Sequence, residues 1–310
     1  MTTATPASPD LASRLVNGIL SIKPIANFAK HQARSMMIER AESVGVQWTK
    51  EATTLRNRGI DTWAAELQSI ENPNLQYPDY YLKPFHAYET GNLSWDAATE
   101  VEVASYAAHA RIWSDAGSKE GDARLRQTFH TILKRELPQD PQTILDLGCS
   151  VGLSTIALQA LYPHAQMTGL DLSPYFLTVA QHRNSPTHPS IQWVHTAAEQ
   201  TPFADRSFDL VSTFLMCHEL PQSATKAILQ EAKRLLTPGG HLAIMDMNPQ
   251  SEAFLKLPPY VFALLKSTEP YLDDYFTLDM ERALAEAGFE SPKVFCNSPR
   301  HRTFVAKAKS

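Results

Sequence analysis

The chain has few cysteines, and their spacing argues against two kinds of small stabilised domain. Its 310 residues contain only Cys149, Cys217 and Cys296, which lie far apart along the sequence. Structural zinc sites and disulfide frameworks need paired or clustered cysteines. The sequence therefore predicts no structural metal and no disulfide scaffold. An odd number of widely spaced thiols is typical of a reducing compartment, so we expect a cytoplasmic protein.

Long apolar runs and a surplus of basic charge are also missing. No stretch approaches the ~20 apolar residues that a transmembrane helix requires, so we expect no membrane span. The 28 basic residues are outnumbered by 33 acidic ones, which gives a formal net charge of −5. Without a polybasic run, the chain lacks the electrostatic signature of nucleic-acid binding. We expect a small-molecule substrate and no nucleic acid, and the sequence leaves a homodimer open.

The composition does provide for a sizeable core, since 43% of the residues are hydrophobic. Before residue 138 the apolar residues recur at three- and four-residue spacing, which indicates helices. Residues 1–10, rich in Thr, Ala, Ser and Pro, are expected to be a non-helical tail. Asp61 and Asp122 are candidate N-caps. We therefore expect a helical N-terminal cap or lid over residues 1–137, with helices at 25–44, 61–70, 95–113 and 122–137.

After residue 138 short apolar strands alternate with helices. Such alternation is typical of a mainly parallel, doubly wound sheet with helices on both faces, which predicts one α/β domain over residues 138–310. Ligands of these sheets bind beyond the carboxyl ends of the strands. The expected strands are 143–147, 166–170, 191–195, 208–214, 241–246, 292–296 and 302–306, and the expected helices are 153–161, 174–182, 224–236 and 278–287.

The turn after the first strand carries the strongest signal. Residues 146–152 read Asp-Leu-Gly-Cys-Ser-Val-Gly. Glycines in such a turn let the backbone approach a ligand closely, and the next helix offers its free N–H groups. A dinucleotide-binding turn requires G-x-G-x-x-G. Counting from Gly148, the second and third positions are Ser150 and Leu153, so the pattern disfavours a nicotinamide dinucleotide.

Four further segments follow that turn. Asp171 ends the second strand, where a carboxylate can accept both hydroxyl protons of a ribose. Residues 197–203 (Ala-Ala-Glu-Gln-Thr-Pro-Phe) follow the third strand, residues 208–211 (Phe-Asp-Leu-Val) begin the fourth, and residues 235–240 (Leu-Leu-Thr-Pro-Gly-Gly) precede the fifth. One such segment alone is a weak signal, whereas five in order form a specific signature.

This signature resembles the motifs of class I S-adenosylmethionine (SAM)-dependent methyltransferases and covers residues 143–306. Residues 146–152 resemble D-x-G-x-x-x-G, residues 197–203 resemble D-A-x-x-L-P-F, residues 208–211 resemble F-D-x-V, and residues 235–240 resemble L-K-P-G-G. The chain resembles most the methyltransferase type 11 and quinone-biosynthesis group with its cyanobacterial and plastid relatives. The resemblance implies a Rossmann-like, doubly wound α/β fold, with a mainly parallel seven-stranded sheet and an antiparallel last strand. It also implies S-adenosyl-L-methionine as the cofactor.

The resemblance further implies the cofactor contacts. Asp146 would position the turn and the methionine part of SAM, and Asp171 would bind the ribose. Ala197 stands where the family usually has Asp, so the side-chain bond to the adenine amino group is in doubt, and Glu199 or backbone groups are the expected substitutes. The expected cofactor residues are Asp146, Gly148, Cys149, Ser150, Gly152, Asp171, Leu172, Ala198, Glu199 and Leu215.

The loop after the fourth strand supplies the candidate catalytic residues. In this fold residues 214–221 would lie beside the methyl group of SAM. An imidazole titrates near neutral pH, so His218 is the leading candidate for a general base. Glu219 either orients it or acts itself. The alternative is that His218 only caps the following helix.

Substrate contacts are expected from three places. Asp246 ends the fifth strand and faces the same cleft, and Arg300 and His301 would meet an anionic or phenolate acceptor if residues 292–296 run parallel to the sheet. Residues 77–95 are rich in aromatics and prolines, which suits an irregular lid that walls an apolar pocket. The alternatives are a structural contact of Asp246 to a neighbouring loop, packing of the cap on the sheet, and a solvated turn at residues 299–302. The expected contacts within the lid are Tyr81, Phe85, His86, Tyr88 and Trp95.

These observations predict a methyltransferase that acts by in-line transfer on a small, aromatic or largely apolar metabolite, at oxygen or carbon, with a His or carboxylate base. An N-methyltransferase and a catalytically silent SAM-binding module are the alternatives. An acceptor oxygen or carbon acid must lose a proton, which is why a base is expected. The sequence leaves the acceptor itself open.

Overall fold

The computed structural model describes residues 23–86, 88–113, 117–184 and 191–309. The tail expected at residues 1–10 lies outside them. Seven strands form one sheet in the order β3-β2-β1-β4-β5-β7-β6. Their bounds are β1 Thr143–Leu147, β2 Gln166–Asp171, β3 Gln192–His195, β4 Phe208–Phe214, β5 Leu236–Met247, β6 Lys293–Cys296 and β7 His301–Lys307.

The sheet is mainly parallel. Strand β1 pairs in parallel with β2 and β4, β2 with β3, and β4 with β5, whereas β7 is antiparallel to both β5 and β6. This confirms the predicted Rossmann-like α/β fold with its antiparallel last strand. Because β6 is antiparallel to β7, which is itself antiparallel to β5, β6 runs in the same direction as β5. Its exit loop therefore lies at the carboxyl edge of the parallel strands.

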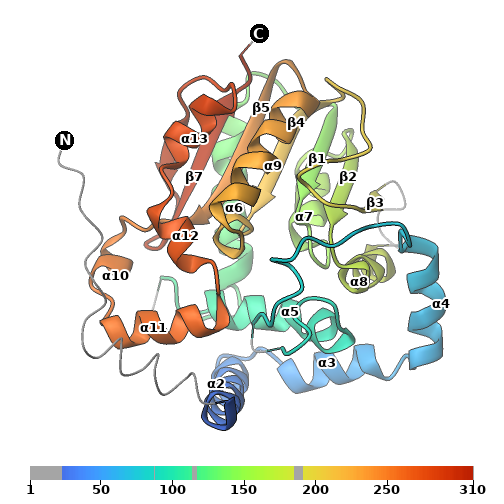
Figure 1. Cartoon of the computed structure of the whole chain (residues 1–310), viewed down its shortest axis with the longest axis vertical. Coiled ribbons are helices and arrows are strands. Elements are labelled where there is room, and N and C mark those ends of the chain that lie inside the picture. Colours follow the sequence, from blue (N-terminus) through green and yellow to red (C-terminus); the bar gives the residue numbers. More distant parts are fainter. Residues whose placement is uncertain (1–22, 87, 114–116, 185–190, 310) are drawn as a thin grey trace.

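Helices cover both faces of the sheet and extend beyond its carboxyl edge. On one face, α6 and α7 bury Phe129 and Leu158 against the sheet, and on the other α9 and α13 bury Leu229 and Leu284. Figure 1 shows α2 to α5 gathered beyond the end of the sheet opposite the C-terminus. The N-terminal helices are α2 Lys23–Ser43, α3 Trp48–Arg56, α4 Ile60–Ile70, α5 Trp95–His109 and α6 Gly121–Glu136. The later ones are α7 Leu153–Leu161, α8 Pro174–Asn184, η1 Cys217–Glu219, α9 Gln222–Leu235, α10 Glu252–Leu255, α11 Pro259–Thr268, α12 Leu272–Thr277 and α13 Met280–Glu286.

The N-terminal helices pack directly on the first turn of the sheet. Trp63 of α4 and Ala97 of α5 share a buried cluster with Val151 of that turn and Phe176 of α8. The Ser173 hydroxyl at the start of α8 donates to the carbonyl of Asn92, 2.7 Å away. The cap is thus built onto the edge of the sheet where a cofactor binds in this architecture.

Several local predictions were wrong. The N-cap residues are Gly59 and Glu120, each two positions before the expected Asp61 and Asp122. Strand β5 begins at Leu236 rather than at residue 241, but its pairing with β4 passes from Leu236 to His241. The Thr-Pro-Gly-Gly residues between them therefore form a bulge. Helices α3 and α10 to α12 were not foreseen, and α5 ends four residues earlier than expected.

Candidate active site

The turn after β1 has an unusual backbone. Gly148, Ser150 and Gly152 all have positive φ, at 66°, 51° and 83°. Two glycines are required, because a Cβ on Gly148 would lie 2.5 Å from the sulfur of Met216, and one on Gly152 would lie 2.6 Å from the ring of Trp193. Ser150 adopts a left-handed conformation that few residues other than glycine tolerate cheaply. The turn therefore holds its backbone tightly against neighbouring side chains.

Two carboxylates hold this turn in place. Asp146 Oδ2 accepts hydrogen bonds from the hydroxyls of Ser154 and Thr155, at 2.6 and 2.7 Å. Asp171 accepts the backbone N–H groups of Ser150 and Ser173, both at 2.8 Å. Burial raises the pKa of each carboxylate to about 6, against the lowering effect of these bonds. In the described part of the chain neither carboxylate has an ion-pair partner, and Asp146 Oδ1 is buried without any hydrogen bond.

The other predicted cofactor residues frame the same edge. Cys149 is buried, and its N–H donates to the carbonyl of Leu170 at 3.0 Å, which ties the turn to β2. Leu172 and Ala198 are buried just after β2 and β3. Leu215 follows β4 with a φ of 58°. These residues add apolar side chains to the same edge of the sheet.

His218 forms a buried pair with Asp246 at the ends of β4 and β5. Its Nδ1 lies 2.7 Å from Asp246 Oδ1, and its backbone N–H donates to Asp246 Oδ2 at 3.3 Å. The carboxylate that orients this ring is therefore Asp246 and not Glu219. Burial opposes the charged imidazolium, but Asp246 outweighs it and raises the pKa of His218 to about 10. Nothing in the described chain hydrogen-bonds to Nε2, which leaves that nitrogen for a ligand.

Glu219 belongs to a second cluster that sequence reasoning only partly found. His86 Nε2 lies 3.5 Å from Glu219 Oε1 and 2.9 Å from Glu269 Oε1. Burial raises the pKa of Glu219 to about 7, with His86 and His218 opposing the rise. Burial lowers the pKa of His86, but Glu269 and Glu219 outweigh it and raise the value to about 9. Glu269 lies in the segment between α11 and α12, where no sequence motif marks it.

The aromatic segment before α5 divides between this edge and the cap. The Tyr80 hydroxyl donates to Glu199 Oε1 at 2.6 Å, and the Tyr81 side chain faces Asp171, whose pKa it lowers. Phe85 is buried with its ring against that of His86, 4.2 Å between centroids. The segment therefore brings its residues at positions 80, 81, 85 and 86 to the sheet edge.

Two predicted substrate residues lie elsewhere. The Tyr88 hydroxyl donates to Glu100 at 2.7 Å, and that buried carboxylate is also paired with Arg34 and Arg56. Trp95 packs its ring 5.3 Å from that of Trp63 and 4.9 Å from that of Tyr175. Both side chains stabilise contacts of the cap instead of reaching the carboxylates of the sheet edge.

A third histidine, His301, follows the exit loop of β6 as the first residue of β7. His301 Nδ1 is 2.8 Å from the Ser298 hydroxyl, and its ring centroid lies 6.0 Å from that of His109. Burial and the neighbouring His109 and His218 lower the pKa of His301 to about 3, so its ring is neutral. His109 itself lies 2.7 Å from Asp122, a buried pair that no sequence motif announced. Arg300 reaches the carbonyl of Arg111 at 3.4 Å.

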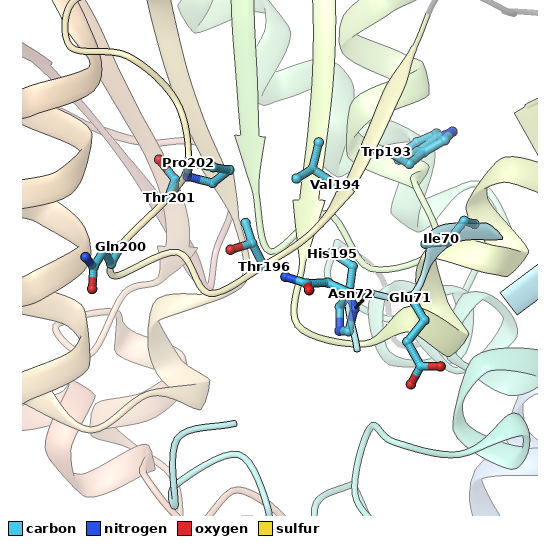
Figure 2. Close-up of a pocket in the computed structure, with 10 residues that line it drawn as sticks. All are labelled: Ile70, Glu71, Asn72, Trp193, Val194, His195, Thr196, Gln200, Thr201 and Pro202. Atoms are coloured by element: carbon cyan, nitrogen blue, oxygen red, sulfur yellow. Dashed lines mark hydrogen bonds between the residues drawn. The ribbon is translucent and has the colours of Figure 1, made fainter. Parts of the chain in front are cut away.

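A pocket of about 530 Å³ lies along the edge strand β3. Figure 2 shows it between the end of α4, at Ile70 and Glu71, and the loop at Gln200. His195 in its wall accepts the N–H of Asn72 at 2.8 Å. None of the residues predicted for cofactor or substrate lines this pocket, so we do not assign it to either.

In the described segments, no helix is both long and apolar enough to cross a bilayer.

Comparison with known proteins places the chain in a family. A sequence model of the methyltransferase domain matches residues 144–240. An uncharacterised methyltransferase of Synechocystis is 32% identical over 53% of this chain and 74% of its own length. A demethylmenaquinone methyltransferase of Chlorobaculum parvum is 31% identical over 49% of this chain and 67% of its own. Five other curated relatives are covered over only 25% to 62% of their length.

A solved structure shares the fold. Phosphoethanolamine N-methyltransferase 2 of Haemonchus contortus, in complex with SAM, superposes with a TM-score of 0.50 at 16% identity, over 69% of this chain and 60% of that one. The fold and the sheet edge define a doubly wound α/β protein that binds a nucleoside-containing cofactor beyond its strands. The chain belongs to the class I SAM-dependent methyltransferases, which confirms the predicted family, cofactor and enzyme class.

The residues at this edge fit SAM. The cofactor carries a sulfonium and an ammonium charge, and Asp146 and Asp171 offer buried carboxylates with raised pKa values. Asp146 retains a buried oxygen with no partner among residues 23–86, 88–113, 117–184 and 191–309. A cationic ligand would compensate both groups, because opposite charges attract strongly where water is excluded.

Proposed function

We propose that this methyltransferase acts on a small aromatic or largely apolar metabolite, at oxygen or carbon. The support is the content of the sheet edge, where Tyr81 and Phe85 lie beside His86 and Glu219. Aromatic walls with a few polar groups are typical of pockets for small apolar ligands. The demethylmenaquinone methyltransferase relative has a quinone-type substrate by name, which is consistent with this class.

We also propose a division of the chain. Residues 1–137 would form the cap and lid, and residues 138–310 the SAM-binding domain. Bound SAM supplies an activated methyl group on its sulfonium. Asp171 would hold the ribose, Asp146 would face the methionine part, and the turn at Gly148 would lie against it. The cap would exclude water and hold the acceptor in line, which accounts for much of the acceleration in such transfers.

The observation that carries the catalytic proposal is the placement of two adjacent side chains, with His218 bonded to Asp246 and Glu219 beside His86. His218, with a pKa raised to about 10, is protonated at neutral pH and suits a hydrogen-bond donor to an acceptor oxygen. Glu219, with a pKa raised to about 7, is partly ionised there. A base works best when its pKa is near the working pH. We therefore assign the base to Glu219 and give His218, oriented by Asp246, the stabilisation of negative charge.

The proposal is tested by mixing the protein with methyl-deuterated SAM and three acceptor panels. Dihydroxyaromatics, enolisable diketones and primary amines would be compared by mass spectrometry of the product and release of demethylated cofactor. Methylation of the first two panels at oxygen or carbon is the expected result. Methylation of amines alone would favour an N-methyltransferase. SAM binding without transfer to any acceptor would favour a silent SAM-binding module.

A further inference from the structure

Glu269, between α11 and α12, has one carboxylate oxygen engaged and one left without a partner. Its Oε1 lies 2.9 Å from His86 Nε2, whereas its Oε2 is buried and accepts no hydrogen bond from any residue that the structure describes. The pairing with His86 therefore accounts for only half of this carboxylate. A buried oxygen that has lost water and gained no donor is unfavourable, so such an atom indicates a ligand donor.

Backbone contacts hold both members of this pair in place. His86 has a left-handed φ of 48°, a conformation that a residue other than glycine keeps only where its surroundings enforce it. Its N–H donates to the carbonyl of Thr268 at 3.1 Å, and the N–H of Glu269 donates to the carbonyl of Leu265 at 3.0 Å. The open oxygen of Glu269 therefore has a defined position at the end of α11, against the segment that carries His86.

Glu269 lies close to the two residues to which we assign the chemistry. The same Nε2 of His86 is 3.5 Å from Glu219 Oε1, so the two carboxylates approach one imidazole nitrogen. Burial raises the pKa of Glu219, and the charge of Glu269 adds to the rise. Burial lowers the pKa of His218, whereas Asp246 and, more weakly, Glu269 raise it. The open oxygen of Glu269 therefore belongs to the part of the sheet edge where the methyl acceptor would bind.

We propose that Glu269 is a second substrate-binding carboxylate, whose Oε2 accepts a hydrogen bond from a hydroxyl other than the group that faces Glu219. The substrate would then carry two hydroxyls, near enough to each other to reach two carboxylates that share one imidazole nitrogen. A neutral donor fits better than an anion, because His86 offers one positive charge to two acids. Glu269 lies outside residues 144–240, which the family's sequence model matches. The inference rests on the proposed function, since Glu219 and His218 mark the substrate site.

The test uses titration calorimetry on the protein saturated with S-adenosylhomocysteine, which allows no turnover. Catechol is compared with 2-methoxyphenol, and hydroquinone with 4-methoxyphenol, because each ether keeps the ring and one hydroxyl but lacks the second O–H. For the wild-type protein we expect at least one diol to bind about tenfold tighter than its ether, because a buried carboxylate built to accept an O–H rejects the analogue without it. In Glu269→Gln the amide can donate to the ether oxygen, so this ratio should fall to about threefold or less.

Two further variants accompany Glu269→Gln. Glu269→Asp keeps the charge but withdraws the carboxylate by one methylene, so it should also lower the ratio. Asp273→Asn is the matched control, because Asp273 is an exposed carboxylate of α12, shortly after Glu269 in the chain. It should keep the wild-type ratio, and it shows what the loss of one negative charge does by itself.

A wild-type protein that binds neither diol at millimolar concentration, or binds both no more than about threefold tighter than their ethers, would overturn the inference. An unchanged ratio in Glu269→Gln would overturn it as well. If the wild-type protein preferred a diol through Glu269 but transferred a methyl group to no substrate, the proposed function alone would be contradicted. If it methylated phenols without preferring diols, only the inference on Glu269 would fail.

Discussion

The two halves of the sheet edge satisfy their charged groups in different ways. Around β1 and β2, Asp146 and Asp171 accept bonds from hydroxyls and N–H groups that all lie within the β1–α7–β2 unit or the first turn after it. In the other half the partners come from segments much further apart in the sequence, since His86 lies beside both Glu219 and Glu269. The cofactor half is local in sequence, and the acceptor half is assembled by tertiary structure.

This difference indicates which segments can change the acceptor specificity while SAM binding is kept. A local unit keeps its geometry when other segments change, because its hydrogen bonds lie inside one supersecondary motif. The acceptor half depends on three separate segments meeting at one point, with His86 before α5, Glu219 after β4 and Glu269 between α11 and α12. Changes in any of these segments would alter which acceptor is bound without disturbing the binding of SAM.

The largest loss of activity is expected from Glu219→Gln, which removes the proposed base from the acceptor half. The amide cannot accept the acceptor proton, so we expect kcat to fall about 10²- to 10⁴-fold, as for other lost bases. SAM affinity should stay within about threefold, because the change lies in the acceptor half. In the wild-type protein kcat should rise with pH through about 7, where Glu219 ionises, and the variant should lose that limb.

Glu269→Gln is the matched control for Glu219, since both carboxylates lie beside the same imidazole. We expect a smaller loss of kcat and a retained limb near pH 7. If Glu269→Gln lost the limb and Glu219→Gln kept it, the base would be Glu269. If neither changed the profile, the acceptor would need no protein base.

The same contrast between local and long-range contacts determines which features could be predicted from the sequence alone. The positions of the strands along the chain and the cofactor turn followed from apolar periodicity and from acids at strand ends, which are local signals. Helices α10 to α12 were missed because helices this short show no clear apolar period. The N-caps at Gly59 and Glu120 were missed because neither makes a side-chain capping bond that its residue type would indicate. His109–Asp122 and His86–Glu269 join residues whose proximity only tertiary folding creates.

A second change, Asp171→Asn, probes the cofactor half. Removal of a charged acceptor of the ribose hydroxyls costs about 1.5–3 kcal/mol, roughly 10- to 100-fold in the Kd for SAM. The pKa of Asp171 in the ligand-free protein is raised to about 6. A cationic ligand favours the ionised form, so affinity is full above pH 6 and is lost as pH falls through that value. We expect the ionisation of Asp171 alone to raise the wild-type Kd about tenfold between pH 7 and pH 5.

Calorimetry at both pH values checks this expectation. The Asn variant should bind weakly with a flatter pH profile, and residual dependence would belong to Asp146, whose pKa is also raised to about 6. A wild-type affinity that is constant from pH 5 to 7 would contradict the idea that these carboxylates ionise on binding. If Asp171→Asn bound SAM with unchanged affinity, Asp171 would not be the residue that holds the ribose.

The smallest effect on activity is expected from Tyr88→Phe, which tests a residue that the sequence placed in the substrate site. Its hydroxyl is 2.7 Å from the buried carboxylate of Glu100, which retains Arg34 and Arg56 as partners. Loss of one hydrogen bond to a charged group should lower the free energy of unfolding by about 1–2 kcal/mol. Turnover should change less than twofold. Thermal or denaturant unfolding and steady-state kinetics measure the two quantities on one sample. A tenfold loss of turnover at unchanged stability would mean that Tyr88 reaches the acceptor, and that the cap contributes more to the acceptor half than its contacts indicate.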